Sequence, residues 1–334
     1  MPANLPPQYF EEEKALRAAK TPAEKIEVLE RMLAVIPHHK GTDKLIAQIR
    51  RRIAKLKVEA QKKRGGSRHK DVYTLRREGA GQVAMVGLPN TGKSTLLAHL
   101  THATPEIADY PCTTRIPLPG MMRFENVQVQ LIDTPPLQDE MTEAGLFHLF
   151  RQADAWLLVL DLLDEPVLQV ALIEEELARH KLYLSSPDDA SQGRDKGEQP
   201  AGRVSKPTLL VGNKLDLPGA VAEYERLLQE YGARFPAVAI SAQAGTGLDA
   251  LRQAVYRLLG VIRVYTKSPG KKPNFAEPVI LKAGSTVADL AASIHTEFLA
   301  RLKFARIWGE GRFDGQKVAR DHPLREGDIV EMHV

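Results

Sequence analysis

The chain has 334 residues, of which 43% are hydrophobic and 26% are charged, and its formal net charge is +4. This length exceeds one typical domain, so we expect two or three folded units, and the apolar content is sufficient for their cores. The single cysteine, Cys112, excludes a framework of internal disulfides, and no apolar stretch approaches the roughly 18 residues of a membrane-spanning helix. The first residues lack the apolar segment of a signal peptide, and we therefore expect a cytoplasmic protein with no membrane partner.

Residues 1–70 are predicted to form a helical hairpin as a separate domain. Residues 21–24 (TPAE) combine an N-cap, a proline at the first helical position and a capping-box glutamate. Apolar residues then recur at helical spacing as far as Ile36, and a second helical stripe spans 45–56. Two amphipathic helices joined by a short turn are expected to pair with each other.

The second predicted helix and the segment after it are strongly basic, and a Gly-Gly-Ser break interrupts them at 65–67. A run of charges is often only a solvated surface. The density of this one, with few acidic residues between the basic ones, favours a flexible arm that contacts the phosphates of a nucleic acid. The predicted contact residues are Arg50, Arg51, Arg52, Lys62, Lys63 and Arg64.

In residues 71–260, short apolar runs alternate with turns and helical patterns. The runs lie at 83–86, 127–132, 155–160, 208–211 and 237–240. This alternation predicts an α/β domain with a mostly parallel sheet, helices on both of its faces and ligand sites beyond the carboxyl ends of the strands. A polar stretch at 185–206 interrupts the pattern and is predicted to be a surface loop.

The first apolar run leads directly into a phosphate-binding pattern. Gly87 is followed by four residues and then by Gly92, Lys93 and Ser94. Glycines let the backbone N–H groups point at a phosphate, and the helix that follows adds its positive N-terminus. A strand-to-helix turn that binds nothing is the alternative, and the strand before the loop and the helix after it argue against that. The predicted phosphate-loop residues are Gly87, Asn90, Thr91, Gly92, Lys93, Ser94 and Thr95.

Asp133 stands at the end of the run 127–132. In a protein with a phosphate loop, a carboxylate at this place can help to hold Mg²⁺ together with the hydroxyl of Ser94. An aspartate at a strand end is common, so this signal is weak by itself.

The nucleotide base is predicted from two later motifs. Asn213, Lys214 and Asp216 follow the run 208–211, and a carboxylate such as that of Asp216 can accept hydrogen bonds from two donors that guanine presents together and adenine does not. The run 237–240 is followed by a segment whose backbone N–H can reach guanine O6. The predicted base-binding residues are Asn213, Lys214, Asp216, Ser241, Ala242 and Gln243.

Residues 261–334 are predicted to form a small α+β domain. It begins with β-like stretches at 262–265 and 278–281. A helix that starts near Thr286 and a strand at 305–308 follow them.

These motifs resemble the Obg/DRG group of P-loop GTPases, where DRG stands for developmentally regulated GTP-binding protein. The match rests on 87–95 (GLPNTGKST), on 108–114 (ADYPCTT), which is similar to switch I of that group, and on the base motif at 213–216. The C-terminal segment resembles a TGS domain, a β-grasp module shared with threonyl-tRNA synthetases and stringent-response synthetases. The resemblance implies GTP and GDP as ligands, Mg²⁺ held with the help of Thr114, and hydrolysis that depends on Lys93, Thr114 and Asp133.

The chain departs from this group in the segment after Asp133. It lacks the room for the insertion that DRG proteins usually carry there, and Pro136 replaces a glycine whose N–H contacts the γ-phosphate in GTPases. Leu137 stands where many small GTPases have a glutamine that positions water. The resemblance therefore implies slow hydrolysis, and Asn90 matches an asparagine that helps several relatives to bind K⁺.

The sequence thus predicts a GTP-binding protein with slow GTP hydrolysis that acts on ribosomes or another structured RNA. The alternative is a non-catalytic adaptor for RNA or protein that GTP merely stabilises, which Pro136 and Leu137 favour. A third possibility is that the TGS-like domain receives a partner protein or a small ligand.

Overall fold

The computed structural model describes residues 6, 8, 15, 22–36, 49, 52–53, 73–101, 116–137, 144–188, 202–309 and 313–333. The chain divides into two compact units, Met1–Val72 and Tyr73–Val334. Among the described residues, no helix has both the length and the apolar character that crossing a bilayer requires.

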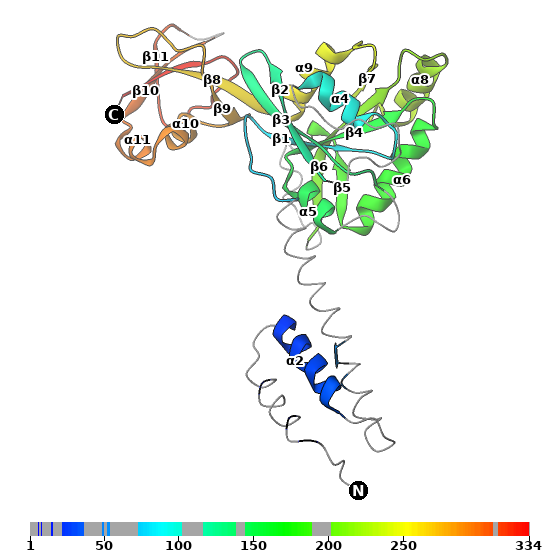
Figure 1. Ribbon diagram of the computed structural model, residues 1–334. Coiled ribbons are helices and arrows are strands. Elements are labelled where there is room, and N and C mark those ends of the chain that lie inside the picture. The colour runs from blue at the N-terminus through cyan, green and yellow to red at the C-terminus, as the bar shows by residue number, and fades with distance from the viewer. Residues whose placement is uncertain are drawn as a thin grey trace. The chain divides into compact units, whose positions relative to one another are not determined.

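The first unit contains helix α2, Pro22–Val35 (Figure 1). Its apolar side buries Val28, Leu29 and Met32 in one cluster with Ile49 and Ile53. Those two isoleucines come from the predicted second helix, most of which lies outside the described residues. The described part of the predicted basic arm is Arg52, which is exposed.

The second unit begins with a sheet of seven strands, in the order β2-β3-β1-β4-β6-β5 with β7 paired to β6 (Figure 1). Its strands are β1 Gln82–Val86, β2 Leu118–Phe124, β3 Val127–Asp133, β4 Ala155–Asp161, β5 Leu182–Ser185, β6 Val204–Asn213 and β7 Ala237–Ala239. All pairs are parallel except β2 with β3. The expected mostly parallel sheet is therefore confirmed, and the antiparallel hairpin β2–β3 lies at one edge.

Helices cover both faces of this sheet, as predicted. They are α4 Lys93–Leu100, α5 Ala144–Gln152, α6 Pro166–Arg179, α8 Ala220–Tyr231 and α9 Leu248–Leu258. Successive residues of a strand point to opposite faces, so Val83 packs in a core with α4 and α9 while Ala84 packs in a core with α5, α6 and α8. Strands buried on both faces explain the continuous apolar runs in the sequence.

The segment between β5 and β6 is shorter than the loop predicted at 185–206. Ser185 is the last residue of β5, and β6 already starts at Val204, because Leu182–Ser185 pairs in parallel with Val204–Pro207. Residues 189–201 of the predicted loop lie outside the described part of the chain.

The C-terminal part of this unit is a five-stranded sheet in the order β11-β10-β12-β8-β9. Its elements are β8 Val261–Lys267, β9 Val279–Lys282, α10 Val287–Ile294, α11 Thr296–Arg301, β10 Phe304–Trp308, β11 Gln316–Val318 and β12 Ile329–His333. One face of the sheet forms a core with Val287 and Leu290 of α10. A capping box between Thr286 and Asp289 begins α10, where the sequence predicts a helix start.

The C-terminal sheet contacts the turn between β2 and β3. Asn126 donates from its amide to the Tyr265 hydroxyl, at 3.0 Å, and to the Phe275 carbonyl, at 3.1 Å. Arg263 bridges the two sides because it donates to Glu125 and Asn126 in the turn and to Glu326 in its own domain. The β2–β3 hairpin, which lies between the segment similar to switch I and Asp133, is therefore fixed to the C-terminal domain.

Candidate functional site

The predicted phosphate loop lies between β1 and α4, and two of its glycines are required by close packing. A Cβ on Gly87 would lie 2.5 Å from the Val159 carbonyl oxygen. Gly92 has φ +88°, and a Cβ there would lie 2.3 Å from the side-chain nitrogen of Asn213. Only glycine fits at both positions, so the chain can bring the loop close against β4 and the later base motif.

Lys93 is the first residue of α4 and is 6% exposed. Its Nζ donates to the carbonyl oxygens of Gly87, at 3.1 Å, and Leu88, at 2.8 Å. The ammonium group therefore lies across the loop at the N-terminus of the helix, where a positive charge can contact phosphate oxygens.

Ser94 and Asp133 meet beside this lysine. The Ser94 hydroxyl donates to Asp133 Oδ2 at 2.5 Å, although 39 residues separate the two in sequence. Asp133 is 1% exposed and ends β3, which pairs directly with β1. A hydroxyl and a carboxylate oxygen at this place match the all-oxygen ligands that Mg²⁺ prefers, so the two residues fit that ion. Thr114, the third predicted ligand, lies outside the described residues.

Asn213 joins the phosphate loop to the base motifs. Its Nδ2 donates to the Thr91 carbonyl at 2.8 Å, and its Oδ1 accepts from the Ala242 N–H at 2.9 Å. The side chain is 3% exposed, so both bonds are shielded from water. One buried amide thus holds together three segments that are far apart in the chain.

The remaining predicted base residues lie in the loops after β6 and β7. Asp216 and Gln243 are exposed, and Lys214 has φ +70° and forms an ion pair with Asp161 at the end of β4. Ser241 is fully buried and accepts from the Ala244 N–H at 2.9 Å. The two loops are thereby fixed with the Asp216 carboxylate in solvent, where it is accessible to a base.

Asp161 is not among the site residues predicted from the sequence. The signal for it is an acidic residue directly after the apolar run 155–160, the same kind of signal that selects Asp133. Its partner could not be predicted, because the Lys214 side chain reaches it from a neighbouring strand.

The segment after Asp133 closes onto the phosphate loop. The Thr134 hydroxyl donates to the Met85 carbonyl at 2.6 Å, and the Leu137 N–H donates to the Gly87 carbonyl at 3.2 Å. Leu137 is 4% exposed and packs in the core with α5. Leu137 is predicted from the sequence as a residue that cannot orient water, and the burial of its side chain is an additional finding.

Two known protein families match separate parts of the chain. A family described as "50S ribosome-binding GTPase" matches residues 82–188, which include the phosphate loop and Asp133. A family described as "TGS domain" matches residues 262–334.

Whole-length relatives come from archaea and eukaryotes. An uncharacterized GTP-binding protein of Methanocaldococcus jannaschii is 31% identical over 92% of this chain and 91% of its own length. Developmentally-regulated GTP-binding protein 2 of Homo sapiens is 25% identical over 92% of this chain and 98% of its own length. A solved structure of a GTP binding protein from Pyrococcus horikoshii OT3 covers 75% of this chain and 99% of its own, with a TM-score of 0.53 at 19% identity, and supports the fold. The chain belongs to the developmentally regulated GTP-binding proteins, a family of P-loop GTPases with a C-terminal TGS domain, and is a GTP-binding protein.

Proposed function

We propose that this protein is a slow GTPase whose nucleotide state controls its action on ribosomes or another structured RNA. The observation that carries the proposal is the contact of Ser94 with Asp133 beside Lys93, with the base loops held to the same place by Asn213. These groups suit a guanosine triphosphate, because they combine a phosphate loop, a pair of Mg²⁺ ligands and an acceptor for guanine.

In the proposed reaction, water attacks the γ-phosphorus of GTP in line. The bond from this phosphorus to the β–γ bridging oxygen breaks, GDP and inorganic phosphate leave, and the protons of the water go to the phosphate and to solvent. Lys93 and the N–H groups of the phosphate loop stabilise the charge that develops on the phosphate oxygens. Ser94 and Asp133 would hold Mg²⁺, which neutralises phosphate charge when it is bound, and Thr114 is proposed to complete its ligands. Asp216 and the N–H groups around Ala242 would bind guanine.

Slow hydrolysis follows from two residues after Asp133. Pro136 has no N–H, so it cannot make the hydrogen bond that a glycine at this position would donate to the γ-phosphate. The Leu137 side chain is held in the core, and its N–H is bound to Gly87. Neither residue can position water, so an external component is expected to supply what the chain lacks.

Ribosomes are the proposed site of action for two reasons. The family that matches residues 82–188 is described as ribosome-binding, and the predicted basic arm supplies charges that suit an RNA backbone. A cytoplasmic location goes with this role.

Co-sedimentation with ribosomal subunits tests the proposal. The full chain is loaded with GDP in one arm and with a non-hydrolysable GTP analogue in the other. Stronger association with the analogue is expected, and association that is equal in both arms would mean that the nucleotide does not control it.

The second candidate is a largely non-catalytic adaptor, and the burial of Leu137 together with Pro136 favours it. Equal affinities for GTP and GDP, with hydrolysis that ribosomes do not stimulate, would support the adaptor function and contradict the GTPase function.

A K⁺ ion at Asn90 is proposed as an aid to hydrolysis. Asn90 is exposed at the tip of the phosphate loop with φ +61°. Hydrolysis is expected to be faster in KCl than in NaCl at the same ionic strength, and equal rates would exclude this role. A partner protein on the TGS domain remains a further proposal.

A further inference from the structure

Lys214, the second residue of the base motif, has a backbone conformation that favours glycine. Its φ is +70°, in the left-handed region. Such a conformation costs free energy and persists where neighbouring contacts hold it, often at a binding site. The contact found here is the ion pair between the Lys214 ammonium group and Asp161 at the end of β4. Asp161 is therefore the group that fixes the charged end of Lys214.

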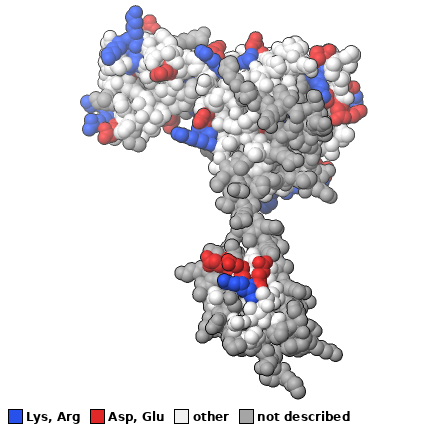
Figure 2. Space-filling model, in the orientation of Figure 1, with Lys and Arg blue, Asp and Glu red and all other residues white. Residues whose placement is uncertain are grey.

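Asp161 is largely buried beside the base motif. It is the direct partner of Asn213 in the register of β4 with β6, and its side chain is 13% exposed. Acidic side chains over α8, by contrast, lie at the surface of the molecule (Figure 2). Asp161 uses both carboxylate oxygens, because Oδ2 accepts from Lys214 Nζ and Oδ1 accepts from the Leu163 N–H at 3.0 Å. The carboxylate is thus held in one orientation, toward Lys214.

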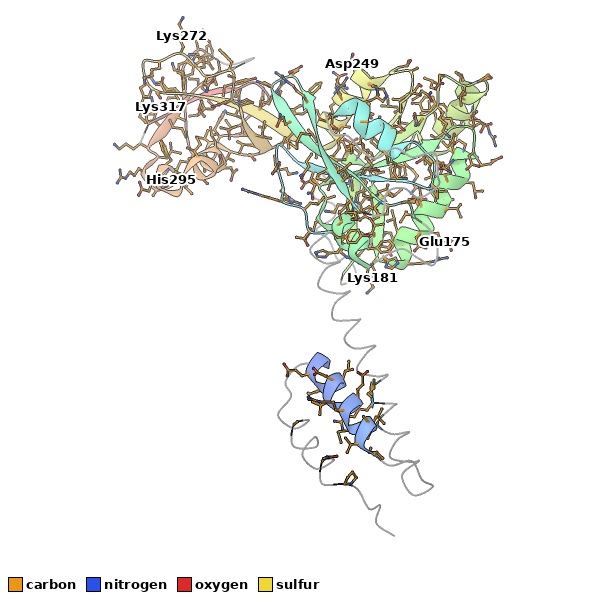
Figure 3. The ribbon with its side chains drawn as sticks, in the orientation of Figure 1. Glu175, Lys181, Asp249, Lys272, His295 and Lys317 are labelled. Carbon is orange, nitrogen blue, oxygen red and sulfur yellow. The ribbon has the colours of Figure 1, made fainter. Side chains whose placement is uncertain are left out.

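The turn that carries Asp161 is held by Gln169 of α6, which is 2% exposed. Gln169 Oε1 accepts from the Asp161 N–H at 3.1 Å. Its Nε2 donates to the Asp161 carbonyl at 2.9 Å and to the Asp164 carbonyl. Glu175, which Figure 3 labels on the same helix, is exposed to solvent instead. One buried amide therefore fixes the backbone from which the Asp161 side chain extends.

The same turn contacts the base motif directly. The Leu162 N–H donates to the Asn213 carbonyl at 3.2 Å. A Cβ on Gly212 would lie 2.7 Å from the Leu162 side chain, so glycine at this position lets the turn approach β6 closely. The turn and the base motif are therefore bonded to each other by their backbones as well as by the ion pair.

From this arrangement we infer that Asp161 is a positioning residue for guanine nucleotides. It holds the Lys214 side chain extended across the base site, so that the apolar stem of the lysine covers one face of the purine ring. Gln169 in turn holds Asp161. The inference uses only the binding of GTP and GDP, so it does not depend on ribosomes or on the rate of hydrolysis.

The physical reason is that a lysine side chain is costly to order. It has four rotatable carbons, and its rotamer freedom is lost when it packs against a ligand. A stem that is fixed at its backbone and at its Nζ has already lost much of this freedom, so nucleotide binding costs less. The stem also offers apolar surface to the ring while its charged end stays paired. Removal of the Asp161 charge should therefore weaken binding without changing which base is preferred.

The first experiment measures the affinity of the full chain for GDP and for a non-hydrolysable GTP analogue by titration calorimetry. Asp161→Asn keeps the shape of the side chain and removes its charge, and it should weaken the binding of both nucleotides by about fivefold or more. Asp164→Asn removes the same charge at an exposed position in the same turn and should leave both affinities within about twofold. Unchanged affinity in Asp161→Asn, or equal losses in the two variants, would overturn the inference.

A double-mutant cycle separates positioning from a general effect on the fold. Lys214→Met keeps an unbranched stem and removes the ammonium group that Asp161 holds. If Asp161 acts through Lys214, Asp161→Asn should change GDP affinity by less than about twofold in the Lys214→Met protein. A loss in that background as large as in the natural chain would overturn the inference, because Asp161 would then act without Lys214.

Base preference gives a second readout that a merely structural role would not produce. IDP lacks the exocyclic amine of guanine, which Asp216 is predicted to bind at the edge of the ring. Asp161→Asn should weaken GDP and IDP by the same factor, because the Lys214 stem covers the face of the ring and not its edge. Asp216→Asn should instead reduce the preference for GDP over IDP. A preference that falls as much in Asp161→Asn as in Asp216→Asn would overturn the inference.

Discussion

At the scale of single residues, Asn213 is the side chain on which the nucleotide site most depends. Its amide makes buried hydrogen bonds to the Thr91 carbonyl and the Ala242 N–H. The sequence motif predicts Asn213 as a base-binding residue. The structure adds its link between the phosphate loop and the base loop, because Asn213 lies at the carboxyl end of β6, near the ends of the neighbouring strands.

Asn213→Ala is therefore expected to leave two buried polar groups without a partner. The cost is about 1–3 kcal/mol of unfolding free energy per group left unsatisfied, and GTP affinity should fall with it. Urea unfolding and titration with a fluorescent GTP analogue measure the two effects. Gln243→Ala, at an exposed position next to Ala242, is the control for stability. An Asn213→Ala protein as stable as the control would show that these two hydrogen bonds contribute nothing to stability.

Pro136 offers a gain-of-function test. Pro136→Gly restores an N–H at the position where GTPases contact the γ-phosphate. A hydrogen bond to a charged group contributes about 1.5–3 kcal/mol, so the preference for GTP over GDP should rise by roughly tenfold or more. The ratio of the two affinities in the variant and in the natural chain measures this. A ratio that does not change would mean that this segment does not contact the γ-phosphate.

At the scale of elements, the sequence predicted the strands and helices of the interior better than those at the edges. The buried strands β1 and β4 read as nearly continuous apolar runs, and β3 reads as an apolar run that Gln128 and Gln130 interrupt, so all three could be found from the sequence pattern. Strand β2 contains Pro119 and Gly120, which an edge strand tolerates and an interior strand does not, and it was not predicted. Strand β5 has four residues, too few for a periodic signal.

The start of α10 near Thr286 was predicted from the sequence. The capping box found there makes a contribution to stability that depends on pH. Hydrogen bonds from the backbone N–H and the side chain of Thr286 lower the pKa of Asp289 below its usual value. A lowered pKa means that the cap stabilises fully above the unfolded pKa of about 3.9 and loses this contribution as the pH falls through the folded value.

Asp289→Ala should cost about 1 kcal/mol of unfolding free energy at pH 7. The difference from the natural chain should shrink as the pH falls below about 4, because the natural carboxylate then becomes protonated. Urea unfolding at several pH values measures this. Asp321→Asn, at an exposed position outside the capping box, is the control, and a difference that is constant with pH would contradict the assigned role.

The contact between the β2–β3 turn and the C-terminal domain is a second testable element. Arg263 donates to Asn126 in the turn and to Glu326 in the C-terminal domain. Glu326 also accepts from the Tyr256 hydroxyl, and burial together with this hydrogen bond raises the pKa of Tyr256 well above its usual value. Arg263→Ala should therefore raise hydrogen exchange in the turn 124–127, whereas Arg301→Ala should not. Equal protection of the turn in both variants would show that Arg263 does not hold it.

At the scale of the whole molecule, the sequence predicted the nucleotide-binding fold and its TGS partner, but not how they are linked. A sequence motif predicts the structure of the loop that contains it. The hydrogen bond between Asn126 and Tyr265 joins residues that are 139 positions apart and belong to no motif, so it could not be predicted. The burial of Leu137 has no motif either, since the core that contains it combines nearby α5 with β1, which is far away in the chain.

The predicted basic arm should make ribosome binding depend on salt. If it tracks phosphates, the affinity for ribosomes should fall steeply as salt rises, with a slope that decreases when Arg50, Arg51, Arg52, Lys62, Lys63 and Arg64 are changed to alanine. Co-sedimentation across a series of KCl concentrations measures the slope. The same slope in both proteins would show that the arm does not bind RNA.

The central proposal is a slow GTPase that acts on ribosomes, and ribosomes are the proposed external component that supplies what Pro136 and Leu137 lack. Its most direct test is single-turnover GTP hydrolysis by the full chain, with and without ribosomal subunits. Slow hydrolysis by the chain alone is expected, because neither Pro136 nor Leu137 can position water, and stimulation by ribosomes of about tenfold or more should follow. A rate that ribosomes leave unchanged, in a protein that binds GTP and GDP equally, would contradict the claim.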